Sequence, residues 1–274
     1  MHSSSAKALD RLLRPAGLLL LFAAWWLLSE SGLVGKTLIA TPSEVLEVTL
    51  RTWSAPSPDS HGLKEHLSET LENALLGWTL AGVAGVLAGY LVGRSWVTFK
   101  LSDSTLEFVR AIPPVLAFPL FLVAFDFGRS AYVGTIVFGC FPIAVIAVAQ
   151  GIRAIDRERI EIFRIHRSSE TVRALIGFME ILPVILLAAR ITFSFALIIA
   201  VVTEMVFAPR SGLGIGSVAK DAEIAFDTPL FFSAVLLIGL IGYLINLILS
   251  WIESWLKPST KAKSAQVHPQ PAAG

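Results

Sequence analysis

The sequence predicts an all-α membrane protein that crosses the bilayer about six times. Of its 274 residues, 54% are hydrophobic and only 16% are charged, whereas a soluble domain carries about 25% charged residues. Uncharged stretches of 19, 19 and 24 residues occupy 74–92, 131–149 and 229–252. A helix needs about 20 apolar residues to cross the hydrocarbon core, so each stretch predicts one transmembrane span.

A first span is predicted at about 15–28, where the apolar run is shorter. Arg11 and Arg14 precede it and can extend their charges to one interface, while Trp25 and Trp26 suit the opposite interface. A cleaved signal peptide is the rival interpretation. Because no small-residue cleavage pattern follows the tryptophans, we favour a retained helix.

Two more spans are predicted at about 109–125 and 181–203. Each contains a single charged residue, Arg110 in the former and Arg190 in the latter. The total is then six, within a transmembrane domain at 15–252.

The distribution of basic residues predicts the orientation. Fourteen of the 22 Lys and Arg residues lie in segments on one side of the predicted spans, and six lie on the other. The basic side is expected to face the cytoplasm. Both termini then lie there: a short N-terminal segment, 1–14, and a tail, 253–274, which lacks apolar periodicity and is predicted to be disordered.

Between the first two spans, Thr41-Pro42-Ser43 precedes Glu44 and several apolar residues. Thr41 or Ser43 can cap a short helix, in whose first turn Glu44 is favourably placed. An interfacial helix and a solvated loop both remain open here.

The second span contains a row of small residues at every fourth position. Such a row allows a neighbouring helix to approach closely, although the same residues could instead line a route for solute. The row consists of Gly77, Ala81, Gly85, Gly89 and Gly93.

The segment 151–179 is the longest polar stretch between spans. Its pattern predicts two short helices, the second beginning near Glu170 after an N-cap at Ser168 or Ser169. In the simplest interpretation, its arginines only keep this segment on the cytoplasmic side. A charged pair of short helices is also the kind of surface that a peripheral motor subunit would bind. The residues expected to contact that subunit are Arg157, Glu158, Glu161, Ile162, Phe163, Arg164, Arg167, Ser168 and Ser169.

Candidates for the translocation path or gate are charged residues and prolines near the spans. Burying a charge in lipid costs several kcal/mol, which makes Arg190 and Glu204 functional candidates. A solvated cap at the outer end of its span is the alternative for Glu204. Arg110, Pro113 and Pro114 open the third span, where the prolines produce either a plain kink or a cavity-lining break.

From about Leu18 to Ser250, the chain resembles the permease subunits of bacterial ATP-binding cassette (ABC) importers, in the branch that takes up nitrate, sulfonates, taurine and bicarbonate. The order and spacing of several short motifs carry this resemblance. They are Thr41-Pro42-Ser43, His66-Leu67, Arg110-Ala111-Ile112-Pro113-Pro114, Gly151-Ile152-Arg153, Leu182-Pro183, Thr203-Glu204-Met205 and Ser211-Gly212-Leu213-Gly214.

The resemblance implies a type I importer permease of the bacterial inner membrane, which moves a small solute while a separate ATPase subunit binds ATP and Mg²⁺. It also implies a second permease copy or paralogue and an extracytoplasmic solute-binding protein. In the family, the cytoplasmic loop carries a Glu-Ala-Ala motif followed by Gly. Here Ile162 and Phe163 replace the alanines and Arg167 replaces the glycine, which implies an unusual ATPase groove, a partner permease with the standard motif, or lost coupling.

Two other functional classes fit the sequence less well. An ion-coupled secondary transporter or channel would place carboxylates near mid-bilayer, and the sequence indicates none. An intramembrane enzyme would carry a catalytic motif such as His-Glu-x-x-His, and none is present. The chain also has no phosphate-binding Gly-x-x-x-x-Gly-Lys-Ser/Thr loop, so ATP hydrolysis is expected in a partner.

Overall fold

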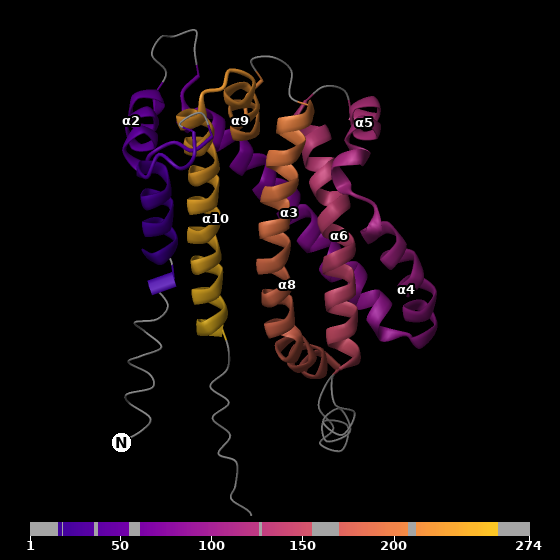
Figure 1. Cartoon of the computed structure of the whole chain (residues 1–274). Helices are drawn as coiled ribbons and strands as arrows, with labels where there is room; N and C mark the ends of the chain where they lie inside the picture. The colour runs from indigo at the N-terminus through magenta and orange to yellow at the C-terminus, as the bar shows by residue number, and fades with distance from the viewer. Residues whose placement is uncertain are drawn as a thin grey trace, which may run out of the picture.

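The computed structural model describes residues 16–17, 19–35, 38–54, 61–125, 128–154, 170–207 and 212–256, the side chains of 170–178 excepted. Within these ranges the chain forms helices joined by turns, without a β-strand (Figure 1). The helices are α2 (Pro42–Thr52), α3 (Leu63–Arg94), α4 (Trp96–Ala111), α5 (Pro114–Phe125), α6 (Arg129–Arg153), α8 (Glu170–Phe207), α9 (Ile215–Ile224) and α10 (Thr228–Leu256), preceded by an N-terminal helix, Leu19–Glu30.

Four of the described helices are long and apolar enough to cross a membrane: Leu63–Arg94, Arg129–Arg153, Met179–Phe207 and Thr228–Leu256. A fifth crossing is available if α4 and α5, which meet at 92°, count as one span. The helix Leu19–Glu30, which overlaps the first predicted span, is shorter than the roughly 20 residues of a full crossing. Six is therefore an approximate count.

The predicted third span contains a corner. Helix α4 ends at Ala111 and α5 begins at Pro114, because proline lacks an N–H and disfavours helical geometry in the residue before it. Helix α4 itself was not predicted from the sequence, since Lys100, Asp103 and Glu107 interrupt its apolar pattern.

Helix α8 joins two elements that the sequence predicted separately. It runs without interruption for 38 residues from Glu170, the predicted start of the second loop helix, through the predicted span 181–203. Pro183 lies inside it, and its missing N–H leaves the carbonyl four residues earlier without its usual helical donor.

The row of small residues in α3 is buried along its length, and its glycines lie against α6. A Cβ at Gly85 would lie 2.4 Å from the Cβ of Ala144, and a Cβ at Gly77 would lie 2.6 Å from that of Ile136. Only glycine allows the two backbones to come so close. Lipid supplies no hydrophobic drive between helices, so this van der Waals packing stabilises the pair.

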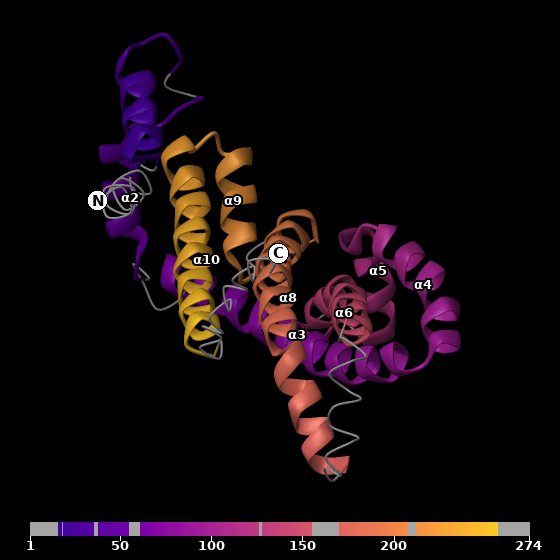
Figure 2. The ribbon, with the colours of Figure 1, turned by 90° about the horizontal axis from the view of Figure 1, so that it is seen from below.

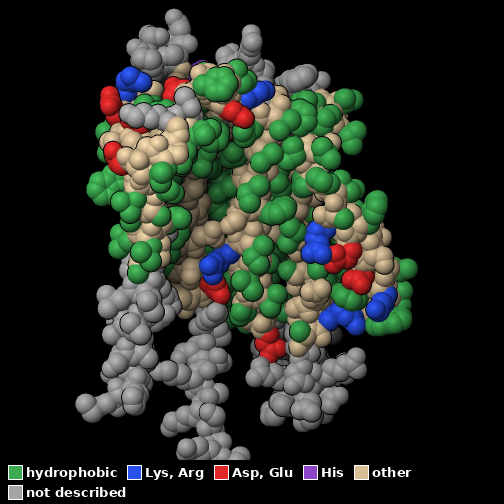
Figure 3. Space-filling model, in the orientation of Figure 1, with side chains coloured by type: hydrophobic (Ala, Val, Ile, Leu, Met, Phe, Trp, Pro, Cys, Tyr) green, Lys and Arg blue, Asp and Glu red, His purple; other side chains and the backbone are tan. Residues whose placement is uncertain are grey.

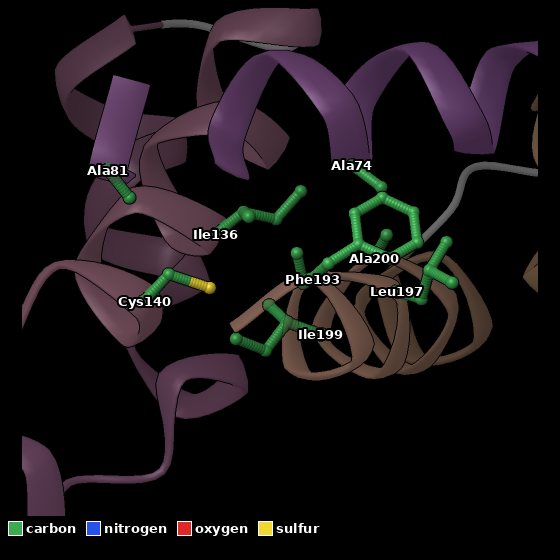
Figure 4. Packing of buried hydrophobic residues seen from close by; sticks show 9 residues of the cluster. Ala74, Ala81, Ile136, Cys140, Phe193, Leu197, Ile199 and Ala200 are labelled. Atoms are coloured by element: carbon green, nitrogen blue, oxygen red, sulfur yellow. The ribbon is translucent and has the colours of Figure 1, made fainter. Parts of the chain in front are cut away.

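Apolar side chains from α3, α6 and α8 form the central core (Figure 4). Phe193 of α8 is fully buried, and its ring meets Trp78 of α3 edge-on, with the ring centroids 5.5 Å apart. Cys140 of α6 is buried in the same cluster, as expected for a lone cysteine in an apolar stretch. This core joins α3 and α8 to α6.

Helix α2 shows that the segment after Thr41 is a capped helix, one of the two alternatives that the sequence left open. The Glu44 N–H donates to Thr41 Oγ1 at 3.3 Å, and the Thr41 N–H donates to Glu44 Oε2 at 2.8 Å, so each side chain satisfies a backbone donor of the other. Thr49 then donates to Ser233 Oγ of α10 at 2.9 Å, which holds α2 against the start of α10.

Two ends of the bundle can be distinguished in Figure 1. The α9 end also contains α2 and the first residues of α6 and α10, whereas α6 and α10 finish at the opposite end. Hydrophobic side chains cover much of the height between the two ends (Figure 3). Large side chains such as Leu87 and Leu120 are 63% and 72% exposed, as expected where lipid replaces water.

Candidate functional site

The structure separates the predicted candidates into three groups. The expected ATPase contacts, from Arg157 to Ser169, lie outside the described residues. Arg110 is an exposed residue of α4 that pairs with Glu107 one turn earlier, and Pro113 and Pro114 form the corner between α4 and α5. The third group consists of Arg190 and Glu204, each of which makes contacts between helices.

Glu204 lies near the end of α8 and is fully buried. Its Oε2 accepts a hydrogen bond from Thr70 Oγ1 of α3 at 2.8 Å and another from the Gly216 N–H of α9 at 3.1 Å. The same Thr70 Oγ1 accepts from the Ile215 N–H at 2.8 Å. The burial excludes a solvated end-cap role for Glu204. We call this junction of α3, α8 and α9 the Glu204 cluster.

The Glu204 cluster satisfies the first amide groups of α9. The leading N–H groups of a helix have no partner within their own helix, and here Thr70 accepts from Ile215 while Glu204 accepts from Gly216. A carboxylate at a helix N-terminus is also favoured by the helix dipole. Side chains of α3 and α8 therefore cap a third helix, α9.

Glycines at the N-cap and in the first turn of α9 allow its start to pack closely against α8 and the Glu204 carboxyl group. Gly214 has a φ of +129°, and a Cβ there would lie 2.5 Å from Glu204 Cδ. A Cβ at Gly216 would lie 2.2 Å from the Val201 carbonyl oxygen. Both glycines therefore pack tightly against α8.

His66 extends the Glu204 cluster by one turn of α3. Its Nδ1 lies 3.1 Å from the Gly214 carbonyl oxygen and 3.2 Å from the Gly214 nitrogen, so either ring tautomer has a partner. Thr70 and His66 are four residues apart and share one face of α3. Neither was a predicted site residue, although His66-Leu67 was part of the family pattern.

Not every polar atom of the Glu204 cluster is paired. Among the described residues, Glu204 Oε1, Thr203 Oγ1 and Ser217 Oγ are buried without a hydrogen-bond partner. Within the same ranges, no Lys or Arg forms an ion pair with Glu204. A carboxyl group without a cation in a buried site is costly to keep charged, so the two donors to Oε2 are its main compensation.

Arg190 pairs with Glu253, an interaction that joins α8 to the last turns of α10. The Arg190 Nη1 donates to Glu253 Oε2 at 2.9 Å, and the two side chains are 33% and 12% exposed. Seven residues earlier in α10, Asn246 donates to Ser194 Oγ of α8 at 2.8 Å. The intramembrane charge of Arg190 is thus compensated by a carboxylate from another span.

Comparison with known proteins gives the family. The model of the binding-protein-dependent transport system inner membrane component matches residues 81–262. This chain belongs to that family. It is accordingly a permease subunit of an ABC importer, and a separate ATPase hydrolyses the ATP.

Three bacterial relatives cover most of the permease. The putative aliphatic sulfonates transport permease protein SsuC of Bacillus subtilis is 27% identical, over 86% of this chain and 84% of that protein. The bicarbonate transport system permease protein CmpB of Synechococcus elongatus is 28% identical, over 90% of each. The nitrate import permease protein NrtB of Leptolyngbya laminosa is 24% identical, over 87% of this chain and 85% of that protein.

A solved structure confirms the predicted fold. A chain of the MetNI methionine ABC transporter, in an inward-facing conformation, superposes with a TM-score of 0.61. The alignment covers 69% of this permease and 94% of that chain, at 18% sequence identity. The fold is therefore that of an ABC importer permease, as the sequence predicted.

Proposed function

We propose that this permease carries a small solute of the nitrate, sulfonate, taurine or bicarbonate kind into the cytoplasm. Support for the solute class comes from three relatives named for sulfonates, bicarbonate and nitrate. The alignment with this chain covers at least 84% of the length of each. The observation that carries the proposal is the family match at residues 81–262, which includes the whole of α4, α5, α6, α8, α9 and α10.

In this proposal, both termini and the segment 154–169 lie in the cytoplasm. Helix α6 finishes at Arg153 and α8 begins at Glu170, so this segment connects them at the end of the bundle opposite α9. The excess of Lys and Arg in the segments assigned to this side supports the orientation. The segment contacts the ATPase, which holds ATP and Mg²⁺, and a solute-binding protein docks at the α9 end.

A second permease completes the path, and ATP binding to the ATPase pair rocks the two permeases between inward and outward access. The Glu204 cluster gives this motion a rigid element, because its hydrogen bonds hold α3, α8 and the start of α9 together. In this proposal, the buried carboxyl group of Glu204 has a structural role at the outer end of the bundle. The Arg190–Glu253 pair lies at the last turns of α10, towards the other end of the bundle, and shapes the path between α8 and α10.

Co-purification tests the coupling. The permease is expressed with its ATPase, and the segment 158–179 is replaced by a Gly/Ser linker of equal length. The ATPase is expected to be lost from the purified complex while the permease still inserts. Labelling of this segment from outside the cell, or solute uptake by the permease alone in liposomes without a nucleotide-hydrolysing partner, would contradict the proposal.

Uptake measurements test the path residues. An Arg190→Gln variant that inserts normally is expected to change the rate or selectivity of uptake for a panel of labelled nitrate, sulfonate, taurine and bicarbonate. Unchanged transport of every solute would remove Arg190 from the path and leave the pair with Glu253 a purely structural role.

A further inference from the structure

An apolar groove runs between α3 and α8 on the surface of the bundle. It has a volume of about 380 Å³, its walls include Val83 and Leu87 of α3 and Ile185 of α8, and Ala144 of α6 contributes to its base. Among its polar lining groups, the Trp78 indole N–H donates to the Ala189 carbonyl at 2.9 Å, and the Thr192 hydroxyl donates to the Ala188 carbonyl at 2.8 Å. The groove therefore suits a hydrocarbon occupant better than a polar solute.

The groove lies within two membrane spans, Leu63–Arg94 and Met179–Phe207. Figure 2 shows α3 passing across α8 and α6. Gly82 faces it, since a Cβ at this position would meet no atom within 4 Å. By contrast, a Cβ at Gly85, three residues later, would lie 2.4 Å from Ala144. One side of α3 is thus packed against protein, while the other borders a space at hydrocarbon depth.

The same side of α3 continues to a cation at the end of the helix. Tyr90 and Arg94 follow Leu87 at i+3 and i+7, so all three share one helix face. The Arg94 guanidinium carbon lies 5.5 Å from the centre of the Tyr90 ring, which places the charge one turn back towards the groove. Among the described residues, no carboxylate forms an ion pair with Arg94.

The corner between α3 and α4 has the character of a membrane interface. Trp96, the first residue of α4, is 63% exposed, and exposed tryptophans concentrate at the headgroup level. Lys100 of α4 is exposed, and the Arg153 guanidinium carbon lies 4.6 Å from the centre of the Phe99 ring. Arg94, Lys100 and Arg153 together bring three positive charges to this corner, which follows the groove-lining part of α3 along the chain.

We propose that this groove and corner form a binding site for an anionic phospholipid. One acyl chain lies between α3 and α8, over Gly82, and the phosphate group binds the Arg94 guanidinium. Arginine is suited to this role because its planar donors match phosphate oxygens. The bound lipid fills the wedge between two helices and so contributes to the angle at which α3 crosses α8.

Two substitutions test the two parts of the site separately. Gly82→Leu places a side chain in the open space of the groove, and Arg94→Gln removes the phosphate contact. The control is Gly239→Leu in α10, where a Cβ also meets nothing within 4 Å. Each full-length permease, purified in detergent, is titrated with phosphatidylglycerol or phosphatidylcholine, and bound lipid is counted by native mass spectrometry.

Phosphatidylglycerol is expected to bind wild type and Gly239→Leu equally, and Gly82→Leu about tenfold more weakly, because part of the chain site is filled. Arg94→Gln is expected to bind it about fivefold more weakly, and to lose most of the preference over phosphatidylcholine. Circular dichroism and gel filtration confirm that each variant is folded. Equal lipid binding by Gly82→Leu and wild type would overturn the proposal. So would a loss of permease dimers in Gly82→Leu without lipid loss, since the groove would then contact a second copy.

Discussion

The hydrogen bond between Thr70 and Glu204 predicts an energetic coupling between α3 and α8 that can be measured. In Glu204→Ala, the Gly216 N–H loses its acceptor, whereas the Thr70 hydroxyl can turn to the His66 carbonyl oxygen, 3.1 Å away. One buried donor is left unsatisfied, which costs about 1–3 kcal/mol. The lost side-chain packing adds to this cost.

The matching variant, Thr70→Val, keeps the shape of the side chain and removes its hydroxyl. The Ile215 N–H then loses its acceptor and Glu204 loses a donor, so a similar cost of about 1–3 kcal/mol is expected. Because both variants remove the same Thr70–Glu204 bond, the double variant is expected to be less destabilised than the sum of the two. The expected coupling free energy is about 1–2 kcal/mol, within the usual range for contacting residues.

The assay is reversible unfolding of the purified permease in mixed micelles with increasing dodecyl sulfate, followed by helical circular dichroism. As a control, Glu204→Ala is combined with Thr135→Val on α6, and these two changes are expected to add. Thr135 is also fully buried, but its hydroxyl donates within its own helix to the Ala131 carbonyl, at 2.8 Å. If Glu204→Ala and Thr70→Val combine additively to within about 0.3 kcal/mol, the bond does not link α3 to α8 and the reasoning is refuted.

Three further predictions concern contacts between helices. Gly85→Ala is expected to lower the free energy of unfolding by about 1–3 kcal/mol, because its methyl group overpacks against α6. Gly82→Ala is expected to raise it by up to about 1 kcal/mol, because alanine favours the helix more than glycine does. Equal effects of the two variants in the same unfolding assay would contradict the one-sided packing of α3. Gly216→Ala is expected to destabilise by about 1–3 kcal/mol, since its Cβ would lie 2.2 Å from a carbonyl oxygen, and a wild-type melting temperature would count against the tight turn. Arg190→Met is expected to be more destabilising than the double variant Arg190→Met with Glu253→Leu, because the single change takes the Arg190 cation away from a carboxylate whose side chain is only 12% exposed. The reverse order of stabilities would show that the pair does not compensate these charges.

The helical segments were predictable because the signals for them are local. A long uncharged run predicts a span regardless of what surrounds it, and four of the predicted spans correspond to full-length helices. The cap at Thr41 and the helix start near Glu170 were also predictable, since capping depends on neighbouring residues. The corner at Ile112 was less predictable, because adjacent prolines indicate a break in the helix but not its angle of 92°.

The sequence by itself determined the membrane environment, the main spans and the row of small residues, because composition and spacing along one helix are sufficient for each. Only the tertiary structure decided what Glu204 and Arg190 do. Their partners, Thr70 and Glu253, are 134 and 63 residues away in the chain. Burial and pairing of a charge depend on groups brought together by the crossing of helices, and the sequence near the charge holds no signal for them.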